Sequence, residues 1–166
     1  MSLSAINTKI KQRATPKDVF ITPLKLAKTA IDMIEYTELD VWYDPFKNSG
    51  SYYNQFPTDL KAWSEILEGQ DFFEYKDEVG IICSNPPYSM LDKVIEHSIE
   101  LKPHTINYLI GINNLTPKRI EKFNNNNYGL TKIHLCKVYD WFGMSIIAQF
   151  EKDYENVITF DRTVWR

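Results

Sequence analysis

The chain has 166 residues, of which 43% are hydrophobic, 14% aromatic and 25% charged. This length and composition predict one compact soluble domain with its own core, and they exclude bulk disorder. The formal net charge of -3 excludes a strongly basic nucleic-acid-binding surface over the whole chain, although one face could still be basic.

Cysteine content and hydropathy point to a reducing compartment. Cys83 and Cys136 are too few and too scattered for a disulfide framework or a zinc cluster, and we expect both to be reduced core residues. No metal-ligand spacing is visible elsewhere. No apolar run approaches the roughly 20 residues of a membrane helix, and residues 1–14 lack the apolar stretch of a signal peptide. The expected location is the cytoplasm, the nucleus or a viral factory, without a membrane partner.

The first half of the chain alternates helix and strand signals. Residues 1–14 are predicted to be a polar arm and 15–166 a single catalytic domain, which opens with a capped turn at 15–18. Thr22-Pro23 then starts an amphipathic helix over 23–36. Short strands are predicted at 39–44 and 60–65, with a loop between them that contains a helical turn near 51–56. A buried strand follows at 79–84, and Ser89 to Asp92 form a capping box for a helix over 89–101.

The second half predicts the rest of the sheet. Residues 105–111 form a further buried strand, and Thr116-Pro117 opens a short helix that ends in the asparagine run 124–127. Strands over 132–139 and 144–151 form a hairpin, and another strand is expected at 157–160. Strands that alternate with helices predict an α/β fold with a mostly parallel sheet, closed by an antiparallel C-terminal hairpin.

The strongest chemical signal is Asn85-Pro86-Pro87-Tyr88, directly after the buried strand 79–84. Ligands of open α/β sheets bind at the carboxyl ends of strands. The two prolines fix the backbone and lack N–H donors, so the loop presents carbonyl oxygens and the Asn85 amide as acceptors for an amino group. Tyr88 supplies a face on which a planar ring can stack. The simpler interpretation is a strand-to-helix turn in which proline stops strand pairing.

With this motif the sequence resembles the S-adenosylmethionine-dependent amino methyltransferases that modify adenine N6 in DNA. Their hallmark is [Asp/Asn/Ser]-Pro-Pro-[Tyr/Phe/Trp], and further motifs agree in order over most of 18–150. The resemblance implies a Rossmann-like methyltransferase fold, S-adenosylmethionine as cofactor and S-adenosylhomocysteine as product. It implies Asn85, Pro86, Pro87 and Tyr88 as catalytic residues, and as cofactor-binding residues Phe20, Thr22, Pro23, Asp44, Pro45, Phe46, Gly50, Glu65, Asp71 and Phe72.

The resemblance also implies a role for several of these side chains. Asp44 is expected to receive the ammonium group of the cofactor, and Glu65 the ribose hydroxyls. Asp71 is expected to accept from the adenine amino group while Phe72 stacks on the purine. Each residue also has a simpler interpretation: Thr22 as part of a helix cap, Asp44 as a strand end and Glu65 as a solvated acid.

The chain departs from the family pattern at two points. Asn48 stands where the family's cofactor loop has its first glycine, although asparagine tolerates the left-handed conformation that this turn requires. The residues after Tyr88 are all needed for the remaining strands, which leaves no room for a target-recognition domain. We therefore expect a separate recognition subunit, a homo-oligomer, a single-stranded or poorly specified substrate, or an inactive core.

Three features outside these motifs have two interpretations each. His97 is expected at the surface or rim rather than as a base. The basic residues Lys118, Arg119 and Lys122 either contact phosphates or form a solvated helix face. Trp141-Phe142-Gly143 either stacks against a flipped base or turns the hairpin corner.

The sequence therefore predicts methyl transfer to the N6 amine of adenine in DNA. Two alternatives stay open. Related Asn-Pro-Pro-Tyr enzymes methylate RNA bases or the glutamine side chains of proteins, and a glutamine amide needs the same acceptor clamp. The other alternative is a catalytically inactive methyltransferase-like subunit that binds a partner or nucleic acid.

Overall fold

The computed structural model describes residues 20–166, and within this range the backbone forms one mixed β-sheet. The predicted polar arm at 1–14 and the capped turn at 15–18 lie outside the described residues. The sheet has the strand order β2-β1-β3-β4-β6-β5, with parallel pairing from β2 through β4 and antiparallel pairing of β6 with both β4 and β5. The strands are β1 (Trp42–Asp44), β2 (Lys61–Trp63), β3 (Ile81–Ser84), β4 (Thr105–Gly111), β5 (Tyr128–Cys136) and β6 (Ser145–Lys152).

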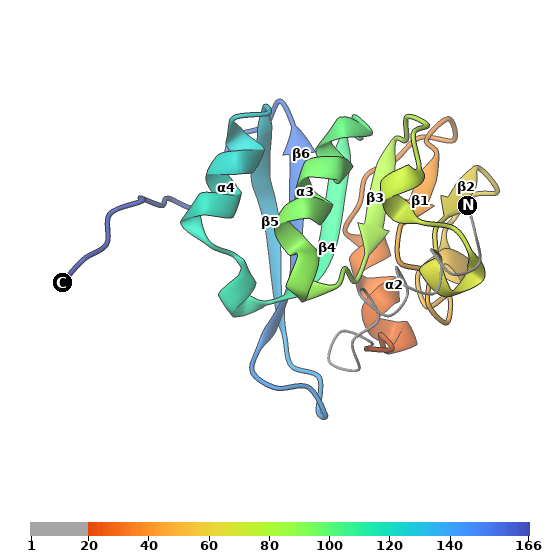
Figure 1. The fold of residues 1–166 in the computed structure, drawn as a ribbon, viewed down its shortest axis with the longest axis horizontal. Coiled ribbons are helices and arrows are strands. Elements are labelled where there is room, and N and C mark those ends of the chain that lie inside the picture. Colours follow the sequence, from red (N-terminus) through yellow and green to blue (C-terminus); the bar gives the residue numbers. More distant parts are fainter. Residues whose placement is uncertain (1–19) are drawn as a thin grey trace.

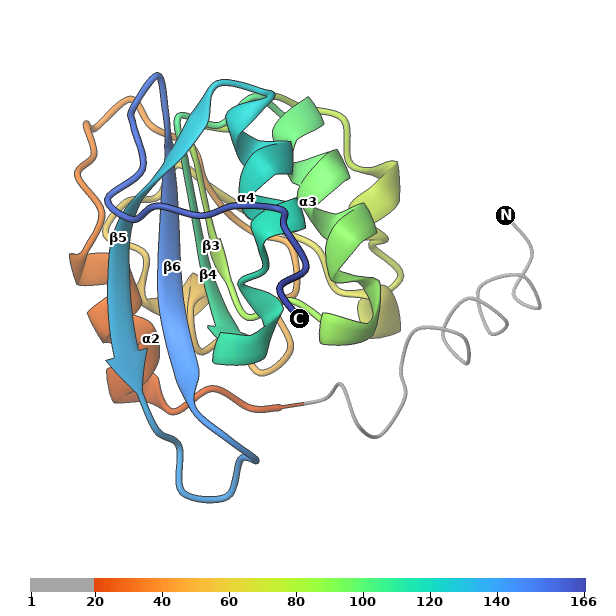
Figure 2. The same cartoon turned by 90° about the vertical axis from the view of Figure 1, so that its left-hand side faces the viewer.

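Helices cover both faces of the sheet (Figures 1 and 2). Helix α2 (Leu24–Asp32) packs on one face, where its buried Ala27, Ala30 and Ile31 join the residues of β3 and β4 that point to that side. Helices α3 (Leu91–Glu100) and α4 (Pro117–Asn124) lie side by side on the other face. The predicted α/β architecture with a closing antiparallel hairpin is therefore confirmed.

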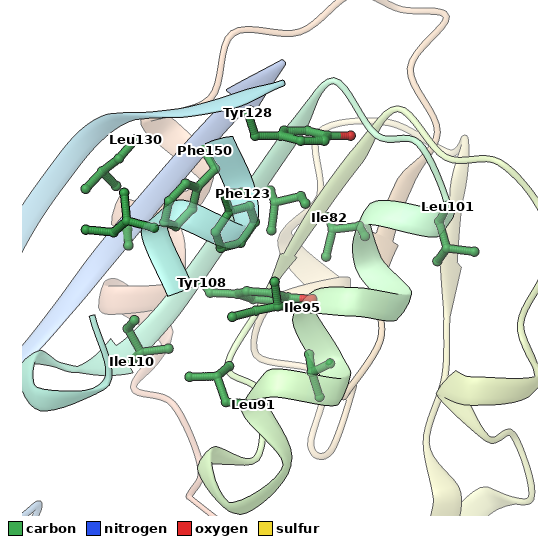
Figure 3. Packing of buried hydrophobic residues seen from close by; sticks show 14 of the residues in the cluster. Ile82, Leu91, Ile95, Leu101, Tyr108, Ile110, Phe123, Tyr128, Leu130 and Phe150 are labelled. Atoms are coloured by element: carbon green, nitrogen blue, oxygen red, sulfur yellow. The ribbon is translucent and has the colours of Figure 1, made fainter. Parts of the chain in front are cut away.

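The larger hydrophobic core lies between the sheet and the pair α3–α4 (Figure 3). Apolar residues at helical spacing on α3, among them Leu91, Val94 and Ile95, are buried against β3 and β4. At the α4 end the Phe123 ring stacks on Phe150 of β6, with ring centroids 3.6 Å apart and an interplanar angle of 12°. This core holds α3 and α4 in place on one face of the sheet.

The connections on the β1–β3 side are short 3₁₀ turns rather than α-helices: η1 (Tyr53–Gln55), η2 (Ile66–Glu68) and η3 (Phe72–Glu74). The helical turn predicted near 51–56 is therefore confirmed. Two more 3₁₀ turns follow β3 and β4, namely η4 (Tyr88–Met90) and η5 (Ile112–Asn114). The turns η2, η3 and η4 supply residues that line the candidate site described below.

Three local predictions are wrong. The capping box at Ser89 does not form the start of α3, because Ser89 lies in η4 and Met90 takes the N-cap position without a side-chain bond. Residues 157–160 are not a strand, although the Val157 N–H donates to the Leu130 carbonyl. The fifth strand begins at Tyr128 rather than at 132.

The early start of β5 has a packing reason. Gly129 resembles a strand breaker in the sequence, but in the structure it permits a close approach of the chain that follows β6. A Cβ atom at Gly129 would lie 2.1 Å from the carbonyl oxygen of Tyr154. The glycine therefore accommodates a neighbouring backbone within the strand.

Other features agree in part with the sequence. Cys83 is fully buried as expected, whereas Cys136 is only half-buried at the end of β5, and both are free thiols. The asparagine run forms an exposed turn, with Asn127 in the left-handed region at φ 65°.

None of the helices between residues 20 and 166 combines the length and the apolar character that crossing a bilayer requires.

Candidate active site

A cleft opens where the parallel strands β1, β2 and β3 end. It encloses about 930 Å³ of empty space, part of which is open to solvent. The segment before α2, the loop after β1, the turns η2 and η3 and the loop after β3 all contribute to its walls. Eight of the predicted site residues line it: Phe20, Thr22, Pro45, Phe46, Glu65, Phe72, Asn85 and Pro87.

The other predicted site residues surround the cleft without lining it. Pro23 is the N-cap residue of α2 and is exposed. Pro86 is buried in the loop after β3, and Tyr88 packs half-buried against the main core. Asp44, Gly50 and Asp71 are buried beneath the loops that form the walls.

Asp44 joins the ends of β1 and β3 from beneath the cleft. Its side chain is completely buried, and Oδ1 accepts a 2.6 Å hydrogen bond from the Ser84 hydroxyl. The N–H groups of Phe46 and Tyr53 also donate to its carboxylate, each at 3.3 Å. Because these contacts are internal, Asp44 organises the loop after β1 rather than presenting its carboxylate to a ligand. Burial raises the pKa of Asp44 to about 7, and the three hydrogen bonds oppose that shift.

The raised pKa predicts a pH-dependent stability. Folded Asp44 binds its proton more tightly than the unfolded residue, whose pKa is 3.8. Its contribution to the free energy of unfolding is therefore full below pH 4, decreases as the pH rises towards 7 and levels off above that. The full slope is about 1.4 kcal/mol per pH unit. We expect Asp44→Asn to lose this slope in urea unfolding between pH 5 and 7, and the exposed Asp59→Asn to keep it. Parallel curves for wild type and Asp44→Asn would contradict the assignment.

The loop after β1 depends on two left-handed residues. Asn48 adopts φ 46° and Gly50 φ 86°, so the prediction that asparagine can replace glycine in this turn is confirmed. The backbone of Gly50 lies in a region that other residues rarely adopt, which favours glycine at this position. The Asn48 N–H donates to Oε2 of Glu65 at 2.8 Å.

Glu65 is the acidic group in the wall of the cleft. It follows β2 and caps η2, with its Oε1 accepting from the Leu67 N–H at 3.1 Å. Each carboxylate oxygen thus has one backbone partner and keeps a further lone pair for a hydroxyl group. Glu65 is therefore not a freely solvated acid.

Phe72 lines the cleft from the turn η3, and the buried Asp71 next to it supports that turn. Asp71 caps η3 through a 3.0 Å bond from the Phe73 N–H to its Oδ1. Phe72 meets Phe46 edge to face with ring centroids 5.1 Å apart, and Phe73 also lines the cleft. Aromatic rings from two loops thus face the same space.

The Asn85 amide has a defined orientation. Its Nδ2 donates to the Phe20 carbonyl at 3.5 Å and to the Thr22 hydroxyl at 3.3 Å. A backbone carbonyl can only accept, so the amide nitrogen belongs on that side and Oδ1 faces away from it. The hydrogen bond from Asn85 gives the Thr22 hydroxyl a role other than helix capping. The N-cap of α2 is Pro23, and no side-chain hydrogen bond caps this helix.

The rim beyond Asn85 is aromatic. Trp141, in the β5–β6 hairpin loop, tilts against Phe20 with centroids 5.4 Å apart, while Phe142 is fully exposed. Because Gly111 at the end of β4 pairs with Ser145 and Ser145 with Cys136, the hairpin loop extends past the same end of the sheet as the cleft (Figure 1). This position is compatible with both interpretations of the Trp141-Phe142 segment, namely stacking against a flipped base and a simple hairpin corner.

Two of the three basic residues on helix α4 are held in ion pairs, whereas Lys118 is exposed. Arg119 forms an ion pair with Asp92 of α3 at 2.9 Å and also donates to the Asn114 carbonyl, and Lys122 pairs with Glu96. A phosphate would have to compete with these carboxylates, so the structure favours the interpretation of a solvated, paired helix face. His97 is buried instead of lying at the surface or rim.

Sequence reasoning missed several residues of the site. Ser84 holds Asp44, and the Ser51 hydroxyl donates to the Thr22 carbonyl at 2.8 Å, which ties the loop after β1 to the segment before α2. Burial raises the pKa of Tyr52, which lines the cleft, well above its usual range. Only the order of the motifs could have indicated these positions. Ser51 and Tyr52 lie in a loop without a local pattern, and Ser84 is the last residue of the buried strand β3.

The chain was compared with known proteins. No family model and no curated protein sequence matches it. Among solved structures, a modification subunit of a putative type I restriction enzyme from Vibrio vulnificus superposes with a TM-score of 0.61 at 11% identity, over 92% of this chain and 48% of that one. The E. cuniculi Mtq2–Trm112 complex responsible for methylation of the translation termination factor eRF1 gives a TM-score of 0.60 at 14% identity, over 81% and 99%.

A third match is M. jannaschii TYW2 in complex with AdoMet, with a TM-score of 0.51 at 12% identity over 81% of this chain and 78% of that one. The chain has the methyltransferase fold. At these identities the likeness is one of fold, and this chain spans about half of the restriction-enzyme subunit. The methyltransferase fold places a ligand site at the carboxyl ends of the parallel strands, which is where the cleft lies.

Proposed function

We propose that this protein transfers the methyl group of S-adenosylmethionine to the exocyclic N6 amine of adenine in DNA. The observation that carries the proposal is the orientation of Asn85. Its amide nitrogen is directed to Phe20 and Thr22, which leaves Oδ1 as an acceptor beside the cleft. An acceptor next to prolines that lack N–H groups suits a substrate amine rather than a carbonyl.

The residues of the cleft fit S-adenosylmethionine. Phe46, Phe72 and Phe73 form an aromatic surface for the adenine ring, and the Glu65 carboxylate keeps acceptor capacity for ribose hydroxyls. Asp44 lies too deep for the ammonium contact that the resemblance implies, and we assign it the role of holding the loop that the cofactor contacts.

In the proposed mechanism Asn85 and the loop around it orient the substrate. The Asn85 Oδ1 and the Pro86 carbonyl accept the two N6 hydrogens, which directs the nitrogen lone pair out of conjugation with the ring. The Tyr88 ring face supports the base, which has to leave its stack to enter the site. Bound S-adenosylmethionine supplies an electrophilic methyl group. Orientation of the two reactants can account for about 7–11 kcal/mol of the barrier. Transfer would leave S-adenosylhomocysteine as the departing group and a positively charged, acidic methylated nitrogen that loses its proton to water, so no general base is required before transfer.

A partner is part of the proposal. The matched restriction-enzyme subunit is about twice as long as the aligned region, and the matched Mtq2 structure is a complex with Trm112. We propose that target recognition in DNA comes from a second subunit or from another copy of this chain. Purification from the native source with the chain tagged, followed by sizing, tests for such an assembly.

Calorimetric titration with S-adenosylmethionine and S-adenosylhomocysteine tests the cofactor site. We expect a Kd in the micromolar range, about −8 kcal/mol. Glu65→Ala should weaken binding about tenfold, because it removes the ribose acceptor and the support of Asn48. The control is Glu68→Ala, an exposed acid on the same turn that pairs with Lys47 and does not line the cleft. No binding by the wild type would favour the inactive-subunit alternative.

Incubation with methyl-labelled cofactor identifies the substrate. Duplex DNA, single-stranded DNA, RNA and a protein extract are offered in parallel. Label on N6-methyladenine in DNA supports the proposal. Label in RNA or on protein glutamine with none in DNA would replace DNA by the corresponding alternative, because all these substrates present an amine or amide to the same acceptors.

A further inference from the structure

His97 is a buried ionisable side chain behind the cleft that the proposed mechanism does not use. It lies on α3 and is 6% exposed. Its Nε2 is 2.9 Å from the carbonyl oxygen of Tyr75, and its Nδ1 is 3.1 Å from Oε2 of Glu100. Both ring nitrogens therefore have defined partners.

The chemistry of these partners assigns the hydrogen on Nε2. The Tyr75 carbonyl can only accept, so Nε2 carries a hydrogen and donates it to that carbonyl whether the ring is neutral or charged. The Glu100 carboxylate, 69% exposed, lies on the other side of the ring at Nδ1.

The segment that His97 contacts carries the aromatic wall of the cleft. The His97 ring meets Phe72 edge to face with centroids 4.7 Å apart and lies 5.7 Å from the Phe73 ring. Both phenylalanines line the cleft. They belong to η3, a single turn of three residues, and so short a turn is not stable by itself. Its position is determined by what it packs against.

Other contacts also hold the segment 71–75 but connect it to different parts of the molecule. Asp71 caps the turn from within, and the Tyr75 ring stacks on Tyr43 of β1 at 4.2 Å. His97 connects the same segment to α3, the helix that follows the Asn85–Tyr88 loop. It thus links the wall of the proposed cofactor site to the element that carries the proposed substrate clamp.

We propose that His97 is a positioning residue for a purine ring in the cleft. Its Nε2–H bond to Tyr75 and its edge contact with Phe72 hold the segment 71–75 against α3, so that Phe72 and Phe73 are in place before the ligand binds. The inference rests on the proposed function, because it takes the ligand to be S-adenosylmethionine or its product. Preorganisation of this wall lowers the ordering cost of binding.

The test compares His97→Leu with His97→Gln in titrations with S-adenosylhomocysteine. Leucine keeps apolar volume without a donor, whereas the amide nitrogen of glutamine reaches about as far from the backbone as Nε2. We expect His97→Leu to raise the Kd about tenfold, because the half-buried Tyr75 carbonyl loses its partner, and His97→Gln to restore it to within about threefold. Glu100→Gln is the control and should change the Kd less than about twofold, since Glu100 faces Nδ1 and solvent.

Amide hydrogen exchange of the ligand-free variants gives a second readout. His97→Leu should exchange faster than wild type at Phe73–Tyr75 and equally at β4, and His97→Gln should resemble the wild type. If the wild type binds the ligand while His97→Leu shows unchanged affinity and unchanged exchange, the inference about His97 is overturned and the proposed function is not. Faster exchange without loss of affinity would also overturn it, because the segment would then not serve the ligand. Absence of binding by the wild type would overturn the proposed function, and the inference with it.

Discussion

Replacing Asn85 with alanine should slow methyl transfer about a hundred- to thousandfold, the loss that follows removal of one preorganised hydrogen-bond partner of a reacting group. The substrate is the one identified by the labelled-cofactor experiment. Binding of S-adenosylhomocysteine should change by no more than about threefold, since the Asn85 bonds to Phe20 and Thr22 are long, at 3.5 and 3.3 Å. Single-turnover rates and calorimetry measure the two effects separately.

Asn85→Asp is the matched variant. It keeps an acceptor oxygen for the substrate amine but points its second oxygen at the Phe20 carbonyl, where the wild-type amide donates. We expect a rate between those of wild type and Asn85→Ala. Unchanged thermal unfolding of both variants shows that the fold is intact. Equal turnover by wild type and Asn85→Ala would remove Asn85 from the mechanism and leave its loop as a structural turn.

The largest effect on stability is expected for Phe123→Ala. Phe123 is 1% exposed, stacks on Phe150 and packs between α4 and the sheet (Figure 3). Removing the ring should lower the free energy of unfolding by about 3–5 kcal/mol through lost burial and a residual cavity. That is a large share of the roughly 5–15 kcal/mol by which domains are stable. Urea unfolding followed by circular dichroism measures the difference.

Two further variants keep this prediction testable. Phe123→Leu retains most of the apolar volume and should unfold at a urea concentration below that of the wild type and above that of the alanine variant. Where the alanine variant does not fold, the decrease from wild type to Phe123→Leu is the result that is measured. Leu135→Ala removes a side chain that is 58% exposed on β5 and should change the free energy of unfolding by less than about 0.5 kcal/mol. A loss below about 1 kcal/mol in Phe123→Ala would mean that α4 does not pack on β6 as described.

Local patterns predicted most elements of the fold. The apolar run 79–84 contains β3, all of whose residues are buried, and Thr116-Pro117 caps and opens α4. Periodicity and turn chemistry are encoded within a few neighbouring residues, so they can be interpreted without the rest of the chain. The order of the motifs also indicated the edge of the sheet at which the cleft lies, because parallel strands end on the same side.

Errors arose where distant segments meet. Gly129 belongs to β5 because it pairs with Glu151 of β6 and leaves room for the backbone at Tyr154, and no pattern at 129 shows either neighbour. The placement of Met90 at the N-cap of α3 is a local difference, because Ser89 belongs to the turn η4 and the helix begins after that turn.

Residue types along the chain were sufficient to predict an α/β fold, its helices and a polar loop after β3 that accepts hydrogen bonds. The tertiary structure alone decided which side chains face the cleft. Asp44 is buried because Ser84, 40 positions along the chain, and two backbone N–H groups surround it, and Asn85 is oriented by Thr22, 63 positions away. His97 is buried because the segment 71–75 packs on it. Burial and the direction of a polar group depend on contacts between segments that are remote in sequence, and such contacts exist only after the chain has packed.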